Sequence, residues 1–158
     1  MSSELNVDDR APDFRASAVG GKYDGRELTL ADFRGQNLVL YFYPKDDTPG
    51  CTTQACGLRD AWPDLEGRAE IFGVSIDPVK SHEKFISKFE LPFALLSDPE
   101  KKIVEAYGVW VEKSMYGKKY RGTERSTFVI GPDGRVAAIF RKVSPGEHVD
   151  LLKKALPA

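Results

Sequence analysis

Cysteine and histidine are scarce in this sequence, and the charges nearly cancel. The 158 residues include two cysteines and two histidines, and the formal net charge is -1. Such a balance gives no electrostatic reason to expect a nucleic acid or an anionic membrane as a partner. Two cysteines do not make a disulfide scaffold, and in a reducing cytosol such a pair is more often catalytic or redox-sensing than structural.

Long hydrophobic stretches and metal-binding patterns are also missing. The longest strongly apolar run is Leu38 to Tyr43, far short of the roughly 20 residues that a membrane-spanning helix needs. Residues 1–10 lack the basic region and apolar segment of a secretory signal, so we expect a cytoplasmic location. His82 and His148 lie far apart, and neither HExxH nor paired CxxC occurs. We therefore expect no metal ion.

Both cysteines lie in one stretch, residues 41–56, which reads YFYPKDDTPGCTTQAC. Thr48 followed by Pro49 is typical of a helix N-cap and a first-turn proline, and the threonine hydroxyl is expected to accept a backbone N–H there. Cys51 is then the third helical residue, where unpaired amides and the positive end of the helix dipole favour a thiolate. We infer that Cys51 is the nucleophile of a thiol enzyme.

The second cysteine, Cys56, follows five residues later. In an intact helix the two Cα atoms would lie about 8.7 Å apart, beyond the roughly 4.4 to 6.8 Å that a disulfide tolerates. Pairing with Cys51 therefore requires the first helical turns to unwind. This spacing argues against a thioredoxin-type disulfide oxidoreductase, whose Cys-x-x-Cys pair bridges without unwinding. A redox sensor or binding module that recruits a partner through its opened helix remains open as an added role.

The alternation of strand and helix patterns indicates an α/β fold with a partly parallel sheet. A chain of this length fits one compact domain, residues 1–158. We expect the first helix to run to about Ala61 and to end or kink at Trp62-Pro63. The aromatic-rich residues 107–122 are expected to form extended segments that pack near the site. The expected elements are a hairpin (12–30), a helical turn (30–33), a buried strand (37–43), a helix (48–61), a strand (69–77), a helix (78–90), a strand (93–97), a helix (98–106), a hairpin (126–141) and a helix opened by a capping box at Ser144. Together they describe a thioredoxin-like fold whose mixed central sheet is flanked by helices and preceded by an N-terminal β-hairpin.

The cysteine stretch resembles a known family. Pro44, Thr48 and Cys51 reproduce the P-x-x-x-T-x-x-C signature of peroxiredoxins, and Cys56 matches the atypical two-cysteine enzymes of the bacterioferritin-comigratory-protein, or peroxiredoxin Q, branch. The resemblance runs from about residue 10 to the end. Further similar blocks are Asp32-Phe33-Arg34-Gly35, Tyr41-Phe42-Tyr43-Pro44, Gly73-Val74-Ser75, Ser81-His82, Leu95-Leu96-Ser97-Asp98, Tyr107-Gly108-Val109-Trp110 and Arg125-Ser126-Thr127-Phe128.

This resemblance implies a role for each matching residue. Cys51 would be the peroxidatic cysteine and Cys56 the resolving one. Thr48 would hydrogen-bond the peroxide, Pro44 would shield the site from water, and Arg125 would complete the anion-stabilising set.

The resemblance also implies a reaction and its partners. The chain would be a thioredoxin-dependent peroxidase that reduces hydrogen peroxide and organic hydroperoxides through a sulfenic acid and then an intramolecular disulfide. A thioredoxin-like or glutaredoxin-like dithiol would reset the enzyme. No prosthetic group is needed, and a monomer or weak dimer is expected.

Overall fold

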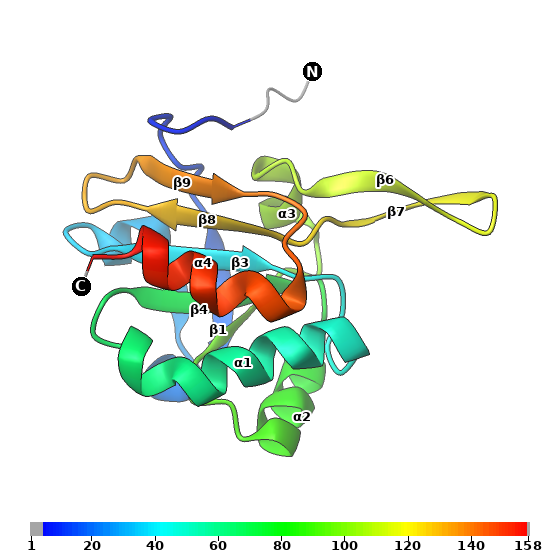
Figure 1. Cartoon of the computed structure of the whole chain (residues 1–158), viewed down its shortest axis with the longest axis horizontal. Helices are drawn as coiled ribbons and strands as arrows, with labels where there is room; N and C mark the ends of the chain where they lie inside the picture. Colours follow the sequence, from blue (N-terminus) through cyan, green and yellow to red (C-terminus); the bar gives the residue numbers. More distant parts are fainter. Residues whose placement is uncertain (1–4, 158) are drawn as a thin grey trace.

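A seven-stranded mixed sheet forms the centre of the computed structural model, which describes residues 5–157 (Figure 1). The strand order is β2-β1-β5-β4-β3-β8-β9. Strands β3, β4 and β5 run parallel, and every other neighbouring pair is antiparallel. The thioredoxin-like α/β fold with an N-terminal hairpin is thus confirmed. The strands are β1 Arg15–Val19, β2 Glu27–Thr29, β3 Leu38–Phe42, β4 Glu70–Ser75, β5 Leu95–Ser97, β8 Ser126–Ile130 and β9 Val136–Phe140.

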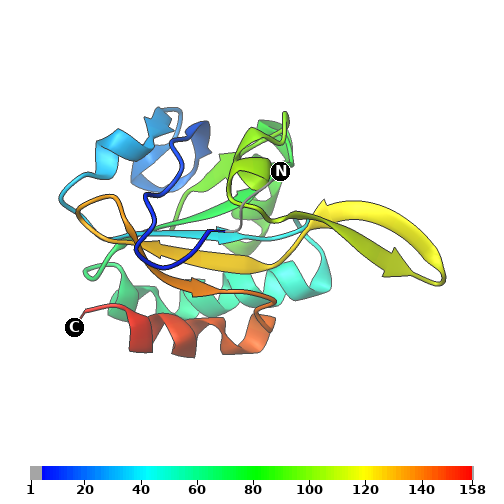
Figure 2. The ribbon, with the colours of Figure 1, turned by 90° about the horizontal axis from the view of Figure 1, so that it is seen from above.

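Helices cover both faces of this sheet. Figure 2 shows α1 (Pro49–Leu65) and α4 (His148–Ala155) side by side on one face, with α3 (Lys102–Ala106) on the other. Helix α2 (Val79–Phe89) packs against β1 and β5. Single 3-10 turns cover Gly21–Tyr23, Leu30–Phe33 and Pro145–Glu147. Across residues 5–157, no helix is both long and apolar enough to span a bilayer.

The central strand β3 is buried along its whole length, as its apolar sequence predicted. Val39 and Tyr41 belong to the core under α1 and α4, whereas Leu40 and Phe42 belong to the core on the opposite face. A strand covered on both faces needs apolar residues at every position. Its carboxyl end leads directly into α1, so the first turn of that helix lies at the edge of the sheet where α/β proteins bind ligands.

The expectation that α1 ends near Trp62-Pro63 is wrong, because the helix continues through Pro63 to Leu65. An interior proline removes one helical hydrogen bond and costs about 3 kcal/mol or more. Tertiary packing opposes that cost here. Leu65 is fully buried, and the Trp62 ring packs on Phe93 with 5.4 Å between centroids.

Two other helices begin later than their sequence signals predicted. Helix α3 starts at Lys102 rather than at Asp98-Pro99, yet the Asp98 carboxylate still accepts the backbone N–H groups of Ile103 and Val104 at 3.0 and 2.9 Å. The capping box at Ser144 opens a 3-10 turn without a side-chain cap, and α4 begins only at His148. Both signals identify a helix start within a few residues of its true position.

The aromatic-rich segment forms a separate two-stranded sheet, β6 (Trp110–Met115) and β7 (Lys118–Thr123). This hairpin projects from the side of the molecule on which α1 begins (Figures 1 and 2). Tyr107 is buried before the hairpin, whereas Tyr116 at its tip is 97% exposed. The expected extended segments are therefore present, but most of the hairpin reaches into solvent.

A buried polar network ties the β3–α1 loop to α2. The Asp46 carboxylate accepts hydrogen bonds from the Tyr43 hydroxyl at 2.6 Å and the Ser81 hydroxyl at 2.7 Å. His82 Nδ1 lies 2.7 Å from the same carboxylate, and the backbone N–H of Asp46 donates to Asp77 at 2.8 Å. The loop that precedes the cysteine helix is thus anchored to two other segments.

The His82 ring is fully buried between two acceptors. Its Nδ1 faces the Asp46 carboxylate, and its Nε2 lies 3.0 Å from the Leu96 carbonyl oxygen. Both ring nitrogens therefore face oxygen atoms, and the ring joins the β3–α1 loop to β5. Removing one member of such a pair leaves a buried charge without its partner.

We predict that His82→Ala lowers the free energy of unfolding by about 3 kcal/mol, because the buried Asp46 carboxylate loses one of its partners. Urea denaturation measures this change. The exposed pair Lys88–Asp47 joins the same loop to the same helix at 2.9 Å, and Lys88→Ala serves as the control, with an expected loss of about 1 kcal/mol or less. Equal losses in the two variants would show that the buried network does not anchor the loop.

Candidate active site

Cys51 lies in the first turn of α1 and is 2% exposed. Pro49 is the first helical residue, which confirms Cys51 as the third. No side chain caps this helix among the described residues. The N–H groups in the first turn of a helix have no intrahelical partner, and those of Gly50 and Cys51 point toward the amino end of α1. This position gives a sulfur anion the positive end of the helix dipole.

Arg125 lies directly before β8, and its guanidinium meets the first turn of α1. Its Nη2 is 3.4 Å from Cys51 Sγ, and its Nη1 donates to Gln54 Oε1 at 2.7 Å. Gln54 is 1% exposed and lies one turn beyond Cys51 on the same helix face. Sequence reasoning assigned no role to Gln54, although its three-residue spacing from Cys51 indicates a shared helix face.

Gly50 makes room for this cation. A Cβ atom at this position would lie 3.0 Å from Arg125 Nη2 and 3.4 Å from Pro145 Cγ. Any larger residue would crowd the guanidinium and the turn before α4, and these neighbours would have to shift by a few tenths of an ångström. The glycine in the cysteine motif therefore has a packing reason in addition to leaving space above the thiol.

Thr48 occupies the N-cap position of α1, as predicted, but it makes a different hydrogen bond. Its hydroxyl donates to the Lys45 carbonyl oxygen at 2.8 Å instead of accepting a helix N–H. The predicted cap bond is therefore wrong, because the hydroxyl group points toward this loop carbonyl and no helix N–H reaches its oxygen. The oxygen lone pairs remain available to accept a hydrogen bond from a ligand. Pro44, also predicted for the site, is half-buried where the chain leaves β3.

His148 is a buried histidine whose pKa is affected by the charge of Arg125. His148 is fully buried, and its Nε2 is 2.9 Å from the Thr127 hydroxyl. Burial, and after it the positive charge of Arg125, lowers the pKa of His148 to about 3. The His148 ring therefore stays neutral at ordinary pH and adds no second positive charge to that of Arg125.

Cys56 is a free, half-buried thiol on α1, and Cys51 is also free in this structure. An unbroken helix connects the two residues, so the reduced arrangement holds them on different helical faces.

Asp46, Asp77 and His82 form the one cluster of potential metal ligands among the described residues, with candidate ligand atoms within 4.8 Å of one another. These atoms already have partners. Asp46 Oδ2 faces Ser81 and His82, and Asp77 Oδ2 accepts the Ser75 hydroxyl at 2.7 Å. Their arrangement therefore suits an internal hydrogen-bonded network better than a metal ion.

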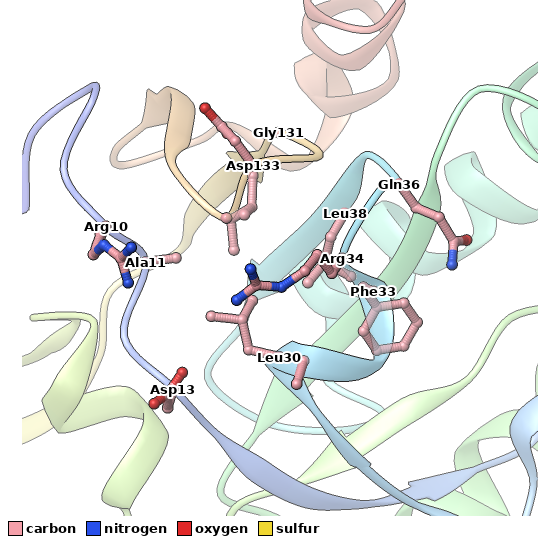
Figure 3. Close-up of a pocket in the computed structure, with 13 residues that line it drawn as sticks. Arg10, Ala11, Asp13, Leu30, Phe33, Arg34, Gln36, Leu38, Gly131 and Asp133 are labelled. Atoms are coloured by element: carbon pink, nitrogen blue, oxygen red, sulfur yellow. The ribbon is translucent and has the colours of Figure 1, made fainter.

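A small cavity of about 80 Å³ lies at the opposite end of β3 from the thiol. Figure 3 shows Arg34 and Leu30 directed into this cavity, with Arg10 and Asp13 at its rim. It is lined by the start of β3 and the β8–β9 turn, so it is not part of the cysteine site.

Comparison with known proteins identifies the family of this chain. The chain matches the AhpC/TSA family over residues 7–139. It is 45% identical to peroxiredoxin Bcp of Bacillus subtilis over 146 residues, which cover 92% of this chain and 90% of that protein. It is 40% identical to peroxiredoxin Bcp of Escherichia coli over 149 residues, which cover 94% of this chain and 93% of that protein.

Solved structures agree with this result. Peroxiredoxin Q of Xanthomonas campestris is 40% identical and superposes with a TM-score of 0.84, covering 96% of this chain and 94% of that one. A cysteine variant of Xylella fastidiosa PrxQ is 36% identical with a TM-score of 0.86, covering 97% and 96%. Structures of the Xanthomonas bacterioferritin comigratory protein, 40% identical with a TM-score of 0.83 and covering 96% and 95%, concern its alkyl peroxide reduction. The chain therefore belongs to the AhpC/TSA family, in the Bcp or peroxiredoxin Q branch, and is a thiol-dependent peroxidase.

Proposed function

We propose that Cys51 is the sulfur that attacks the hydroperoxide and that Arg125 stabilises it. The observation that carries this assignment is the 3.4 Å contact between Arg125 Nη2 and Cys51 Sγ at the amino end of α1. A guanidinium stays protonated at any relevant pH, so its charge is available to a thiolate throughout.

In the first step the Cys51 thiolate attacks the terminal oxygen of the hydroperoxide. The S–O bond forms as the O–O bond breaks, giving a sulfenic acid and an alkoxide, or hydroxide when the substrate is hydrogen peroxide. Sulfur supplies the electron pair, so sulfur is oxidised and the peroxide is reduced. The leaving oxygen then takes up a proton and departs as an alcohol or water.

The surrounding loop orients the substrate. The Thr48 hydroxyl donates its hydrogen bond to the Lys45 carbonyl oxygen, so its own oxygen accepts a hydrogen bond from the peroxide O–H. The free amides of Gly50 and Cys51 donate to the oxygen that becomes negative in the transition state. Pro44 covers the site and limits access by water. These fixed groups hold the reacting oxygen on line with the sulfur.

We further propose that Cys56 resolves the sulfenic acid. Its thiolate attacks Cys51 sulfur, and hydroxide leaves as water after protonation. The first turns of α1 unwind to allow this step, because the intact helix keeps the two Cα atoms too far apart. A thioredoxin-like or glutaredoxin-like dithiol then reduces the disulfide by exchange.

The setting of this cycle is part of the same proposal. Residues 1–158 work as one domain, in a monomer or weak dimer. Two free thiols and the need for a dithiol reductant fit the reducing cytoplasm.

The catalytic assignment predicts different defects for the two cysteine variants. Cys51→Ser should abolish peroxide consumption with a thioredoxin system. Cys56→Ser should still form one equivalent of sulfenic acid on Cys51 but should fail to form the intramolecular disulfide. Peroxide assays together with mass spectrometry of the 51–56 peptide measure both outcomes. Full turnover in Cys51→Ser would overturn the assignment.

The unwinding step predicts a redox-dependent change in hydrogen exchange. Amides of residues 51–58 should exchange more slowly in the reduced protein than in the disulfide form, because the oxidised helix has lost its first turns. Residues 149–155 of α4 serve as the internal reference and should change little. Equal protection of residues 51–58 in both states would contradict the required unwinding.

A further inference from the structure

One face of the β6–β7 hairpin is partly buried near its base. Along β6, Val111 and Lys113 are half-buried, whereas Glu112 and Ser114 are exposed. Side chains alternate between the two faces of a strand. Lys113 is therefore on the face of the hairpin that the body of the protein partly covers.

The Lys113 side chain runs toward the base of the hairpin. Lys113 pairs with Tyr120, and Val111 pairs with Gly122 one step nearer the base. A Cβ atom at Gly122 would lie 3.3 Å from Lys113 Cδ and 3.5 Å from Cε. The lysine stem thus lies across Gly122, in the direction of Arg125 three residues further on.

The charge of the Lys113 ammonium group interacts with those of Arg125 and Cys51, and no other role has been assigned to this lysine. Among the described residues, no hydrogen bond or ion pair engages it, whereas Arg125 binds Gln54 and Cys51. Burial, and then the positive charge of Arg125, lowers the pKa of Lys113, while Cys51 and Glu124 act in the opposite sense. A half-buried lysine in this setting releases its proton more readily than an exposed one.

The reaction requires a proton donor that the groups already described do not provide. The leaving alkoxide is strongly basic, and guanidinium groups do not release protons in proteins. The Thr48 hydroxyl already donates a hydrogen bond to the Lys45 carbonyl oxygen, and His148 is neutral and faces Thr127. Cys51 itself reacts as the thiolate.

We propose that Lys113 donates the proton that the leaving alkoxide or hydroxide takes up. As the S–O bond forms and the O–O bond breaks, a proton moves from the ammonium to the leaving oxygen, giving alcohol or water and a neutral amine. Solvent then returns a proton to the amine. This step rests on the proposed role of Cys51 and adds to it a proton donor from the hairpin.

The test varies the basicity of the leaving group in single-turnover, stopped-flow oxidation of Cys51. For Lys113→Met, we expect the rate constant with ethyl hydroperoxide or hydrogen peroxide to fall about 100-fold, the usual contribution of a general acid. Peracetic acid releases acetate, which needs no proton, so its rate constant should change little. Fast oxidation by peracetic acid also shows that the Cys51 chemistry and the fold are intact.

Two further variants separate proton transfer from charge and from the hairpin fold. Lys113→Arg keeps the positive charge but supplies no transferable proton, so it should lose activity toward ethyl hydroperoxide as Lys113→Met does. Lys118→Met, on the same hairpin near its tip, should match the unmodified protein. Full activity in Lys113→Arg, no loss in Lys113→Met, or an equal loss with peracetic acid would each overturn the proposal.

Discussion

The contact between the Arg125 guanidinium and the Cys51 sulfur is the interaction on which the site depends. It joins two segments that are 74 positions apart in the sequence, the first turn of α1 and the residue that leads into β8. Gln54 fixes the other side of the guanidinium, and Gly50 leaves it space. A cation and free helix amides therefore meet one buried sulfur, the arrangement that stabilises a thiolate and the charge that develops as the peroxide bond breaks.

The fold supports this contact from two directions. Strand β8 pairs with the central strand β3 over its full length, with Ser126 opposite Phe42, so the sheet itself brings Arg125 to the end of the strand that feeds α1. On the other side, Asp46 and His82 anchor the loop before the helix. The loop proposed to bind the substrate is thus anchored, whereas the proposed reaction of Cys56 requires the helix beyond it to open. Interior Pro63 removes a hydrogen bond from that same helix.

The cysteine motif, the buried strand and the helix start could be predicted from sequence, because each depends on residues that are neighbours in the chain. The resemblance to peroxiredoxins supplied Arg125. Sequence reasoning missed the Asp46–His82 contact, since 36 positions separate its members, and it ended α1 too early because the burial of Leu65 lies outside any local rule. The proposed role of Lys113 was missed for the same reason: its stem runs across Gly122 toward the base of the hairpin only because β6 pairs with β7.

The most direct test of the account is the rate at which Cys51 is oxidised when the cation is removed. In stopped-flow oxidation by hydrogen peroxide, Arg125→Met should react about 100-fold more slowly than the unmodified protein, the typical cost of losing one charge-stabilising donor. An unchanged rate constant in a folded Arg125→Met protein would contradict the account, because the sulfur would then owe its reactivity to something other than the contact that organises the site.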